Sequence, residues 1–257
     1  MKRELGVILE QARKRLQEIV DKMDLNNQEV RITCKILTPE EAIGNPLHDD
    51  YPIQLGKERL IEADFMGKKG QAFSDSYFNY SGKVRDVMAL NLETNARRAI
   101  FVSSLNAILA YLGMVPESIH CKNDDLMKCA DHFYNFVEEQ CLDTENVLLV
   151  GLQPRLLEKL TALKKVRVCD LDSDNIGSTK CGVAIDGPER FHDNARWAGA
   201  IFATGSTVVN GTIDEIINAG RSTYFYGVTI AGVSNLLGLK QFCYVAGPKA
   251  SVGMAER

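Results

Sequence analysis

The strongest constraint on the fold is an alternation of short apolar runs and helical patterns that begins at Asn146. Apolar runs of this kind are typical of parallel strands that are buried on both faces. Five of them occur, at residues 147–152, 166–171, 198–203, 223–228 and 241–246. Strands that alternate with helices of about ten residues predict right-handed βαβ units. The sequence therefore predicts a Rossmann-like parallel sheet with helices on both faces.

The first half of the chain has a mixed pattern. Apolar residues recur at spacings of three and four in residues 4–23, 95–112 and 131–140, which predicts three helices. Residues 29–37 alternate as a strand does, and short strands are expected around 59–63 and 71–73. For the rest of residues 44–82 the sequence predicts no secondary structure. We therefore expect an α/β protein with an α+β domain over residues 1–143 and a Rossmann-like domain over residues 144–257.

Composition limits the classes of partner. Nucleic-acid-binding surfaces are usually basic, whereas this chain has a net charge of −4. We therefore expect that the protein does not bind nucleic acid. No apolar run approaches the ~20 residues of a membrane span, and no signal peptide is evident, so we expect a cytoplasmic protein that does not enter a membrane. Seven cysteines without an export signal indicate reduced thiols. The sequence leaves a small-molecule ligand as the expected partner, with a homo-oligomer left open.

The stretch A-T-G-S-T-V-V-N-G-T-I-D-E-I (203–216) joins a predicted strand to a predicted helix. A loop at this place lies at the carboxyl edge of a parallel sheet, where ligands bind. Thr212 and Glu215 fit a capping box. One interpretation is a well-capped turn. The other is a set of free N–H groups and hydroxyls that bind a carboxylate, a phosphate or a polar ring, contributed by Gly205, Ser206, Thr207, Asn210, Gly211 and Thr212.

Asp170 and Asp172 lie at the end of the second predicted strand of the parallel sheet. An acidic residue about twenty positions after the first strand is where nucleotide-binding folds hold ribose hydroxyls. The first turn reads G-L-Q-P-R-L, without G-x-G-x-x-G, and Pro154 has no N–H to donate. The pattern argues against an ordinary NAD site and keeps a smaller adenosyl- or pterin-like ligand open.

The segment from His120 to His132, with Cys121, Cys129 and nearby Cys141, contains good metal ligands. Their spacing matches no closed four-ligand site, so we expect no structural zinc there. His48 and His192 have no Ser or Cys partner in a nucleophile motif. The sequence therefore names no catalytic residue, and whether the protein is an enzyme stays open.

Several motifs resemble the family described as putative heavy-metal chelation, a domain of unknown function. The run from Thr204 to Glu215 matches that family's T-G-S-T/A-x-x-N-G-T-x-x-E segment, and Leu105–Ala107 resembles its L-N-A segment. The chain departs from the family after the fourth strand, where Y-G-V-T-I-A-G keeps Gly227 and Thr229 but lacks the usual prolines. The resemblance implies an enolase-N-terminal-like domain followed by a Rossmann-like domain, with a site in the cleft between them.

On this resemblance, the loop would form one wall of an interdomain pocket. Asp170 or Asp172 and Gly227–Thr229 would come from neighbouring strands, and Asn106 from across the cleft. Asn106 could equally be a packing amide bonded to a backbone carbonyl. Two functions follow. One is a binding protein for a small molecule, metal ion or metal chelate, involved in heavy-metal chelation or in handling a metallophore or metal cofactor. The alternative is an enzyme with a nucleotide- or pterin-like cofactor.

Overall fold

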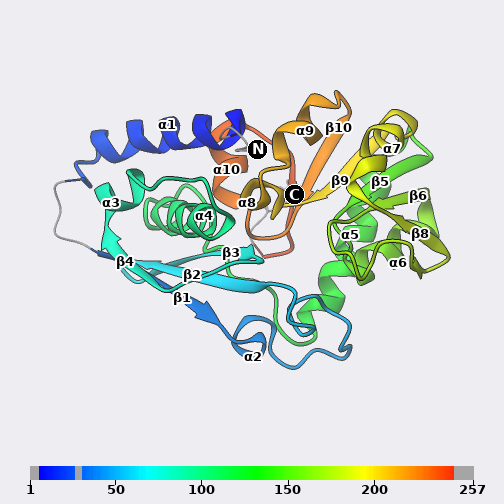
Figure 1. Ribbon diagram of the computed structural model, residues 1–257, viewed down its shortest axis with the longest axis horizontal. Helices are drawn as coiled ribbons and strands as arrows, with labels where there is room; N and C mark the ends of the chain where they lie inside the picture. The colour runs from blue at the N-terminus through cyan, green and yellow to red at the C-terminus, as the bar shows by residue number, and fades with distance from the viewer. Residues whose placement is uncertain (1–5, 27–30, 246–257) are drawn as a thin grey trace, which may run out of the picture.

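The computed structural model describes residues 6–26 and 31–245. Two sheets lie in different parts of the molecule (Figure 1), a four-stranded one of order β3-β2-β1-β4 and a seven-stranded one of order β11-β10-β9-β5-β6-β8-β7. The first comes from the N-terminal half of the chain and is antiparallel, and the second comes from the C-terminal half and is mostly parallel. The predicted α/β class, with an α+β part before a Rossmann-like part, is confirmed.

The antiparallel sheet contains β1 (Arg31–Leu37), β2 (Arg59–Phe65), β3 (Lys68–Ser74) and β4 (Tyr80–Lys83). The two short strands expected at 59–63 and 71–73 are real but longer, and they form a hairpin. Its turn residues Met66 and Gly67 have φ of 54° and 78°, as a two-residue type I′ turn requires. Methionine rarely occupies such a position. The Asn-Gly or Asp-Gly pair that usually marks a hairpin turn is absent here.

Helix α4 (Asn95–Tyr111) packs on β2 and β3, and its other side contacts α8 (Thr207–Asn210) and α10 (Ala231–Leu237). A helix that is apolar all round is buried all round. The run A-I-F-V-S-S-L-N-A-I-L-A is buried throughout, because it lies between elements of both halves. Helix α1 (Val7–Lys22) contacts α9 (Ile213–Asn218) and α10. Helices α2 (Pro39–Ile43) and α3 (Val84–Met88) lie beside the antiparallel sheet (Figure 1).

The second sheet contains the five predicted strands. Their observed bounds are β5 (Asn146–Val150), β6 (Lys165–Cys169), β9 (Ala200–Thr204), β10 (Ser222–Tyr226) and β11 (Gln241–Phe242). The expected end of the last strand, residue 246, lies outside the described residues. The sequence analysis missed β8 (Val183–Asp186), which is parallel to β6, and β7 (Thr179–Lys180), its antiparallel partner. The turn between β7 and β8 has φ of 50° at Cys181, another unusual residue at a left-handed position.

Helices cover both faces of the second sheet, as predicted. On one face, α5 (Asp125–Gln140) and α6 (Pro154–Leu163) pack on the strands, and the Phe133 ring lies 5.2 Å from that of Phe202. On the other face lie α7 (Phe191–Trp197) and α9 (Ile213–Asn218), where Ile213 and Ile216 are buried against strand residues such as Ile201. A 3₁₀ turn at Pro188–Arg190 precedes α7. The boundary at residues 143–144 stays a prediction.

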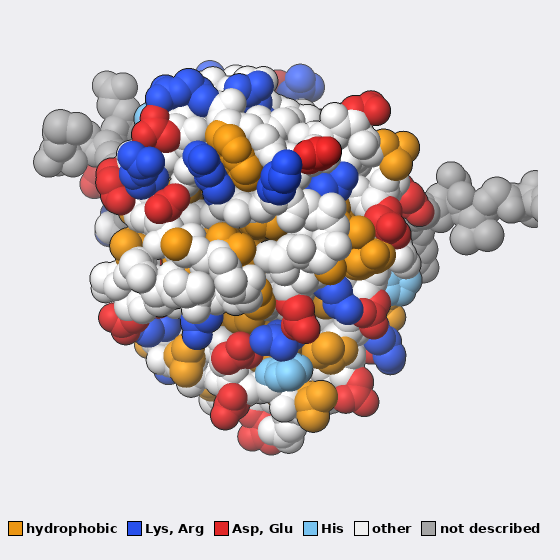
Figure 2. All heavy atoms as spheres, turned by 90° about the vertical axis from the view of Figure 1, so that its right-hand side faces the viewer, with side chains coloured by type: hydrophobic (Ala, Val, Ile, Leu, Met, Phe, Trp, Pro, Cys, Tyr) orange, Lys and Arg blue, Asp and Glu red, His pale blue; other side chains and the backbone are white. Residues whose placement is uncertain are grey.

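Figure 2 shows Lys, Arg, Asp and Glu side chains interspersed on the face formed by the second sheet and its helices, with a row of basic side chains near its top. Within residues 6–26 and 31–245, none of the helices combines the length and apolar character that crossing a membrane requires.

Candidate functional site

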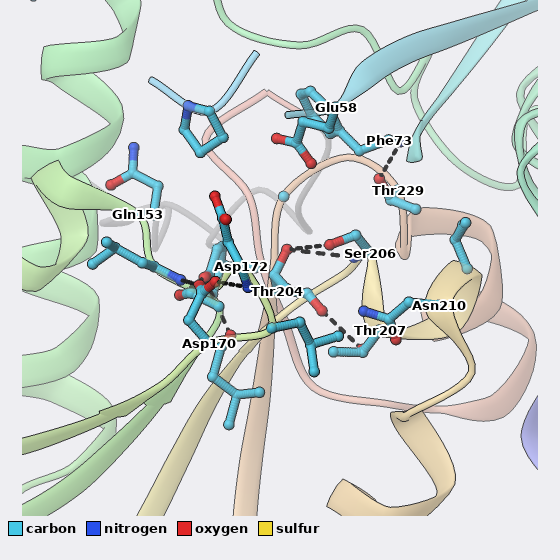
Figure 3. Close-up of a pocket in the computed structure, with 18 of the residues that line it drawn as sticks. Glu58, Phe73, Gln153, Asp170, Asp172, Thr204, Ser206, Thr207, Asn210 and Thr229 are labelled. Atoms are coloured by element: carbon cyan, nitrogen blue, oxygen red, sulfur yellow. Dashed lines mark hydrogen bonds between the residues drawn. The ribbon is translucent and has the colours of Figure 1, made fainter. Parts of the chain in front are cut away.

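A cavity of about 500 Å³ lies at the carboxyl ends of the parallel strands. Residues that follow β5, β6, β9 and β10 line one side of it. The other side comes from the N-terminal half, namely the segment from Tyr51 to Glu58 and the end of β3. Figure 3 shows side chains from both halves around one space. The sheet topology predicts this location, because ligands of open α/β sheets bind beyond the carboxyl ends of the strands.

Eleven residues were predicted from the sequence to bind the ligand, and eight of them line this cavity. The eight are Asp170, Asp172, Ser206, Thr207, Asn210, Thr212, Gly227 and Thr229. The other three, Asn106, Gly205 and Gly211, do not line it. The structure thus brings together the strand-end residues and leaves out one helical amide and two glycines.

The predicted loop from Thr204 to Thr212 contains the helical turn α8, and most of its polar groups bond to one another. The Val209 and Asn210 N–H groups both donate to Ser206 O at 2.9 Å, and Thr207 Oγ1 donates to Thr204 O at 2.8 Å. The expectation of free N–H groups is therefore wrong for most of the loop. With only four residues, α8 also provides no long helix dipole.

The capping box predicted at Thr212 is absent. Its side chain makes no cap bond to α9, and Thr212 Oγ1 instead donates to Asn210 Oδ1 at 2.7 Å. Asn210 Oδ1 also accepts from Thr212 N at 3.1 Å, so this oxygen is occupied. What Asn210 can still offer a ligand in the cavity is its amide nitrogen.

Gly205 and Gly211 have architectural reasons for being glycine. A Cβ on Gly205 would lie 2.9 Å from the Ile230 backbone nitrogen, so this glycine allows close packing of two loops. Gly211 has φ of 81° and ends α8 in the left-handed conformation. A side chain added at Gly205 would therefore meet Ile230 rather than a ligand in the cavity.

Asn106 is a buried link between the two halves. Its Nδ2 donates to Gln71 O at 3.0 Å on β3 and to Thr229 O at 3.1 Å beyond β10. Its Oδ1 accepts from Gly232 N at 2.8 Å at the start of α10. With no exposed surface and its polar atoms already bonded, this amide does not face a ligand. Of the two interpretations of Asn106, the packing amide fits the structure.

Asp170 and Asp172 organise the loop after β6. The Asp170 carboxylate accepts from Leu152 N, in the turn after β5, and from Asp172 N at 2.7 Å. Asp172 Oδ1 accepts from Asp174 N at 3.0 Å and from Lys57 Nζ at 3.5 Å. Lys57 also pairs with Asp174. These bonds tie the N-terminal segment to the sheet edge.

The turn after β5 depends on Gly151, which has φ of 85°. The Tyr226 hydroxyl donates to Gly151 O at 2.7 Å, and burial raises the pKa of Tyr226 well above its ordinary value. Gln153 Oε1 accepts from Leu156 N at 2.6 Å and so caps α6. A helix start capped by Gln153 therefore occupies the place where dinucleotide-binding folds have a glycine-rich pyrophosphate loop.

Glu58 is the functional candidate that the sequence analysis missed. Its carboxyl group points into the cavity (Figure 3) and makes no hydrogen bond with the described residues. Burial, followed by the nearby Asp170 and Asp75 carboxylates, raises the pKa of Glu58 to about 7. The side chain keeps partial exposure because it faces the cavity. Glu58 lies in the unpatterned segment 44–82, so no spacing rule indicated it.

The lining of the cavity is acidic. Its carboxylates come from Glu58, Asp75, Asp170, Asp172 and Glu215, whereas Lys57 is its one lysine or arginine among the described residues. An anion would add like charge to this group, and a cation would reduce the repulsion. The negative charge of the lining therefore disfavours the carboxylate or phosphate ligand that the loop composition suggested.

Thiols and aromatic side chains also line the cavity, among them Tyr51, His120, Cys121 and Cys129. His120 Nδ1 lies 2.9 Å from Cys121 O, and burial lowers the pKa of this imidazole. In the described part of the chain, no three His, Cys, Asp or Glu side chains are grouped to hold a metal ion. The prediction that this segment binds no structural zinc stays a prediction.

Comparison with known families gives one match. Residues 136–247 match the family model DUF364, described as "Putative heavy-metal chelation". The resemblance to this family is confirmed. The match contains the T-G-S-T-V-V-N-G-T segment and covers less than half of the chain, so Leu105–Ala107 lie outside it. No curated protein matches the chain.

Two solved structures of the DUF364 family, both of unknown function, are similar to the chain. One, from Pyrococcus horikoshii, has a TM-score of 0.51 and 14% identity and covers 90% of this chain and 84% of its own. The other, from Desulfitobacterium hafniense DCB-2, has a TM-score of 0.45 and 14% identity over 72% of this chain and 74% of its own. At this identity, the first structure shows a shared fold and nothing about function.

Proposed function

We propose that the protein binds a small, positively charged molecule or metal chelate in the cavity between its two halves. The observation that carries the proposal is the Glu58 carboxyl, which faces the cavity without a hydrogen-bond partner. Asp75 and Asp170 lie near enough to raise its pKa further. Ionised carboxylates gathered in a partly enclosed space repel one another, and a cationic ligand reduces that cost.

The shape and the remaining walls support a ligand of small-molecule size. A volume of about 500 Å³ falls within the ~300–1,000 Å³ of small-molecule sites. Phe73, Leu152 and Phe242 supply apolar walls, while Ser206 and Asn210 supply polar groups. A chelate that presents positive charge and an organic surface matches both kinds of wall. The description of the family as heavy-metal chelation agrees with this class of ligand.

The alternative function, an enzyme with an adenosyl- or pterin-type cofactor, has one observation in its favour. A carboxyl with a pKa of about 7 can accept and return a proton near neutral pH, as general acid–base catalysis requires. Against it, the Asp170 oxygens that would bind ribose hydroxyls already accept the Leu152 and Asp172 N–H groups. We therefore prefer binding to catalysis.

The test begins with native mass spectrometry of protein purified without chelators, followed by calorimetric titration of any ligand it releases. If none is retained, size-matched pairs of organic amines and carboxylates serve as probes. The cationic member of each pair should bind, and Glu58→Gln should weaken its binding ~10-fold or more, since a charged hydrogen bond is worth about 1.5–3 kcal/mol. The exposed Glu139, which lies outside the cavity, provides the matched control Glu139→Gln. Preferential binding of the carboxylates, or unchanged affinity in Glu58→Gln, would refute the proposal.

A further inference from the structure

A groove of about 320 Å³ lies beside β6, β8 and α7, on the side of the molecule that faces the viewer in Figure 2. It shares no lining residue with the cavity described above. The pairing of β8 with β6 is limited to Val168 and Cys169. Among the described residues, no strand therefore lies on that side of Val166 and Arg167, and both residues line the groove.

The guanidinium of Arg167 is held in a fixed orientation at this groove. Its Nη1 donates to Asn194 Oδ1 at 3.1 Å, and its central carbon lies 4.4 Å from the centre of the Trp197 ring. Asn194 is 1% exposed, and its Nδ2 donates to Asp186 Oδ2 at 2.7 Å and to Cys169 Sγ at 3.2 Å. Because the buried amide is bonded through both its oxygen and its nitrogen, the arginine that it holds is fixed as well.

Arg167 keeps most of its hydrogen-bonding capacity for a ligand. Asn194 uses one of the several N–H donors of the guanidinium, and in the part of the chain that the structure describes Arg167 forms no ion pair with a carboxylate. Arg190 also lines the groove and pairs with Asp193 at 3.2 Å. Asp186 is the one carboxylate among the described lining residues, and one of its oxygens accepts from Asn194. The lining therefore carries two guanidinium groups and one carboxylate.

We propose that this groove is a second binding site, which holds the oxyanion group of a small molecule, a carboxylate or a phosphate, on the Arg167 guanidinium. A planar guanidinium presents parallel N–H groups that match two oxygens of such a group. Arg190 adds positive charge, and the volume lies at the lower end of the ~300–1,000 Å³ of small-molecule sites. The inference goes beyond the proposed function, because the groove and the acidic cavity have different walls and opposite charge.

Two substitutions distinguish an oxyanion site from an arginine that only covers the Trp197 ring. Arg167→Gln removes the charged donors and should weaken oxyanion binding ~10-fold or more, as the loss of a charged hydrogen bond does. Asp186→Asn removes the negative charge of the lining but keeps an oxygen that can accept from Asn194 Nδ2, so it should strengthen binding. A change in packing alone would not act in these two opposite directions.

The experiment is a titration of the full chain followed by the fluorescence of Trp197, the only tryptophan of the sequence. Because Arg167 stacks on this ring, an oxyanion bound to the guanidinium should change its emission. The probes are inorganic phosphate, phenyl phosphate and succinate, each compared with sodium chloride at equal ionic strength. We expect a saturable change with an oxyanion and none with chloride, and calorimetry should give the same affinity. The tighter of the phosphates and succinate identifies the oxyanion.

Arg196→Gln is the matched control. Arg196 is exposed, lies on α7 and pairs with Asp193, but does not line the groove. Its replacement removes one positive charge from the same helix and should keep the affinity for the oxyanion. The inference is overturned by the lack of a saturable signal with all three probes, by unchanged affinity in Arg167→Gln, or by an equal loss in Arg196→Gln. Melting temperatures identify a variant that fails to fold, and Arg167→Lys, which keeps the charge but not the planar donors, then serves as the test and should also bind more weakly.

The groove and the cavity are tested separately. Glu58→Gln should leave oxyanion binding unchanged, because Glu58 lines the cavity and not the groove. The comparison of amines with carboxylates is repeated in Arg167→Gln, so that carboxylates bound at the groove do not count against the proposed function. If amines bind in a Glu58-dependent way and no oxyanion binds, only the groove site is refuted. If oxyanions bind at Arg167 and no amine binds, only the proposed cationic ligand is refuted.

Discussion

Replacing Asn106 with alanine should destabilise the whole protein, because this amide links β3, the segment after β10 and helix α10. The change leaves three buried backbone groups without their partner, namely Gln71 O, Thr229 O and Gly232 N. A buried polar group that loses its partner costs about 1–3 kcal/mol. Val228 O, at 3.4 Å, loses a weaker bond.

The three costs do not add fully, because the groups share one partner and water can enter the space left behind. We expect a loss of about 3–5 kcal/mol in the free energy of unfolding. For a chain of this size, each kcal/mol lowers the melting temperature by roughly 2–4 °C. The melting temperature should therefore fall by about 6–20 °C.

The assay is thermal unfolding followed by circular dichroism, together with urea unfolding. Asn235→Ala is the matched control, because Asn235 is exposed and donates one bond, to Met114 O at 3.1 Å. Surface changes of this kind usually stay within about ±0.5 kcal/mol. If Asn106→Ala melts as Asn235→Ala does, the linking role is wrong. Weaker ligand binding without loss of stability would instead restore Asn106 as a ligand contact.

Two further predictions concern the cavity. Gly151→Ala should cost about 1–3 kcal/mol, because the residue has φ of 85° and the new Cβ would lie 2.6 Å from Thr204 Cγ2. The control Gly177→Ala, with φ of 81° and open space, should cost less in urea unfolding, and equal losses would contradict the packing argument. Because the pKa of Glu58 is raised from 4.5 to about 7, the folded state keeps a proton that the unfolded state loses. Stability should therefore fall by up to about 3 kcal/mol as pH rises through that window, and Glu58→Gln should flatten this slope. An equal slope in both proteins would show that Glu58 is ionised like an exposed carboxylate.

Local patterning accounts for most of the secondary structure. Helix α6 (Pro154–Leu163) lies between the first two predicted strands and has the expected length of about ten residues, because a proline start and apolar residues at helical spacing are local signals. The prediction at 131–140 started six residues late, since α5 begins at Asp125 in a polar stretch without a side-chain cap. The hairpins at Met66–Gly67 and Cys181–Gly182 were missed because Met and Cys at left-handed positions carry no turn signal.

The candidate site was likewise predicted only in part from the sequence. Strand-end residues such as Asp170, Ser206 and Thr229 could be placed from the sequence, because parallel strands bring their carboxyl ends to one edge. Whether their polar groups are free could not be predicted. Ser206 and Asn210 bond mostly within their own loop, and the geometry of α8 decides that.

The sequence by itself determined a parallel sheet with helices on both faces and the edge at which a ligand would bind. Periodicity and strand order carry that information along the chain. Only the tertiary structure decided that Glu58 and Asp170 line the same cavity and that the Asn106 amide is bonded to both halves of the chain. Glu58 and Asp170 lie more than a hundred residues apart in the chain, as do Asn106 and Thr229. Contacts of this kind depend on how the two halves pack, which the spacing of residues along the chain does not reveal.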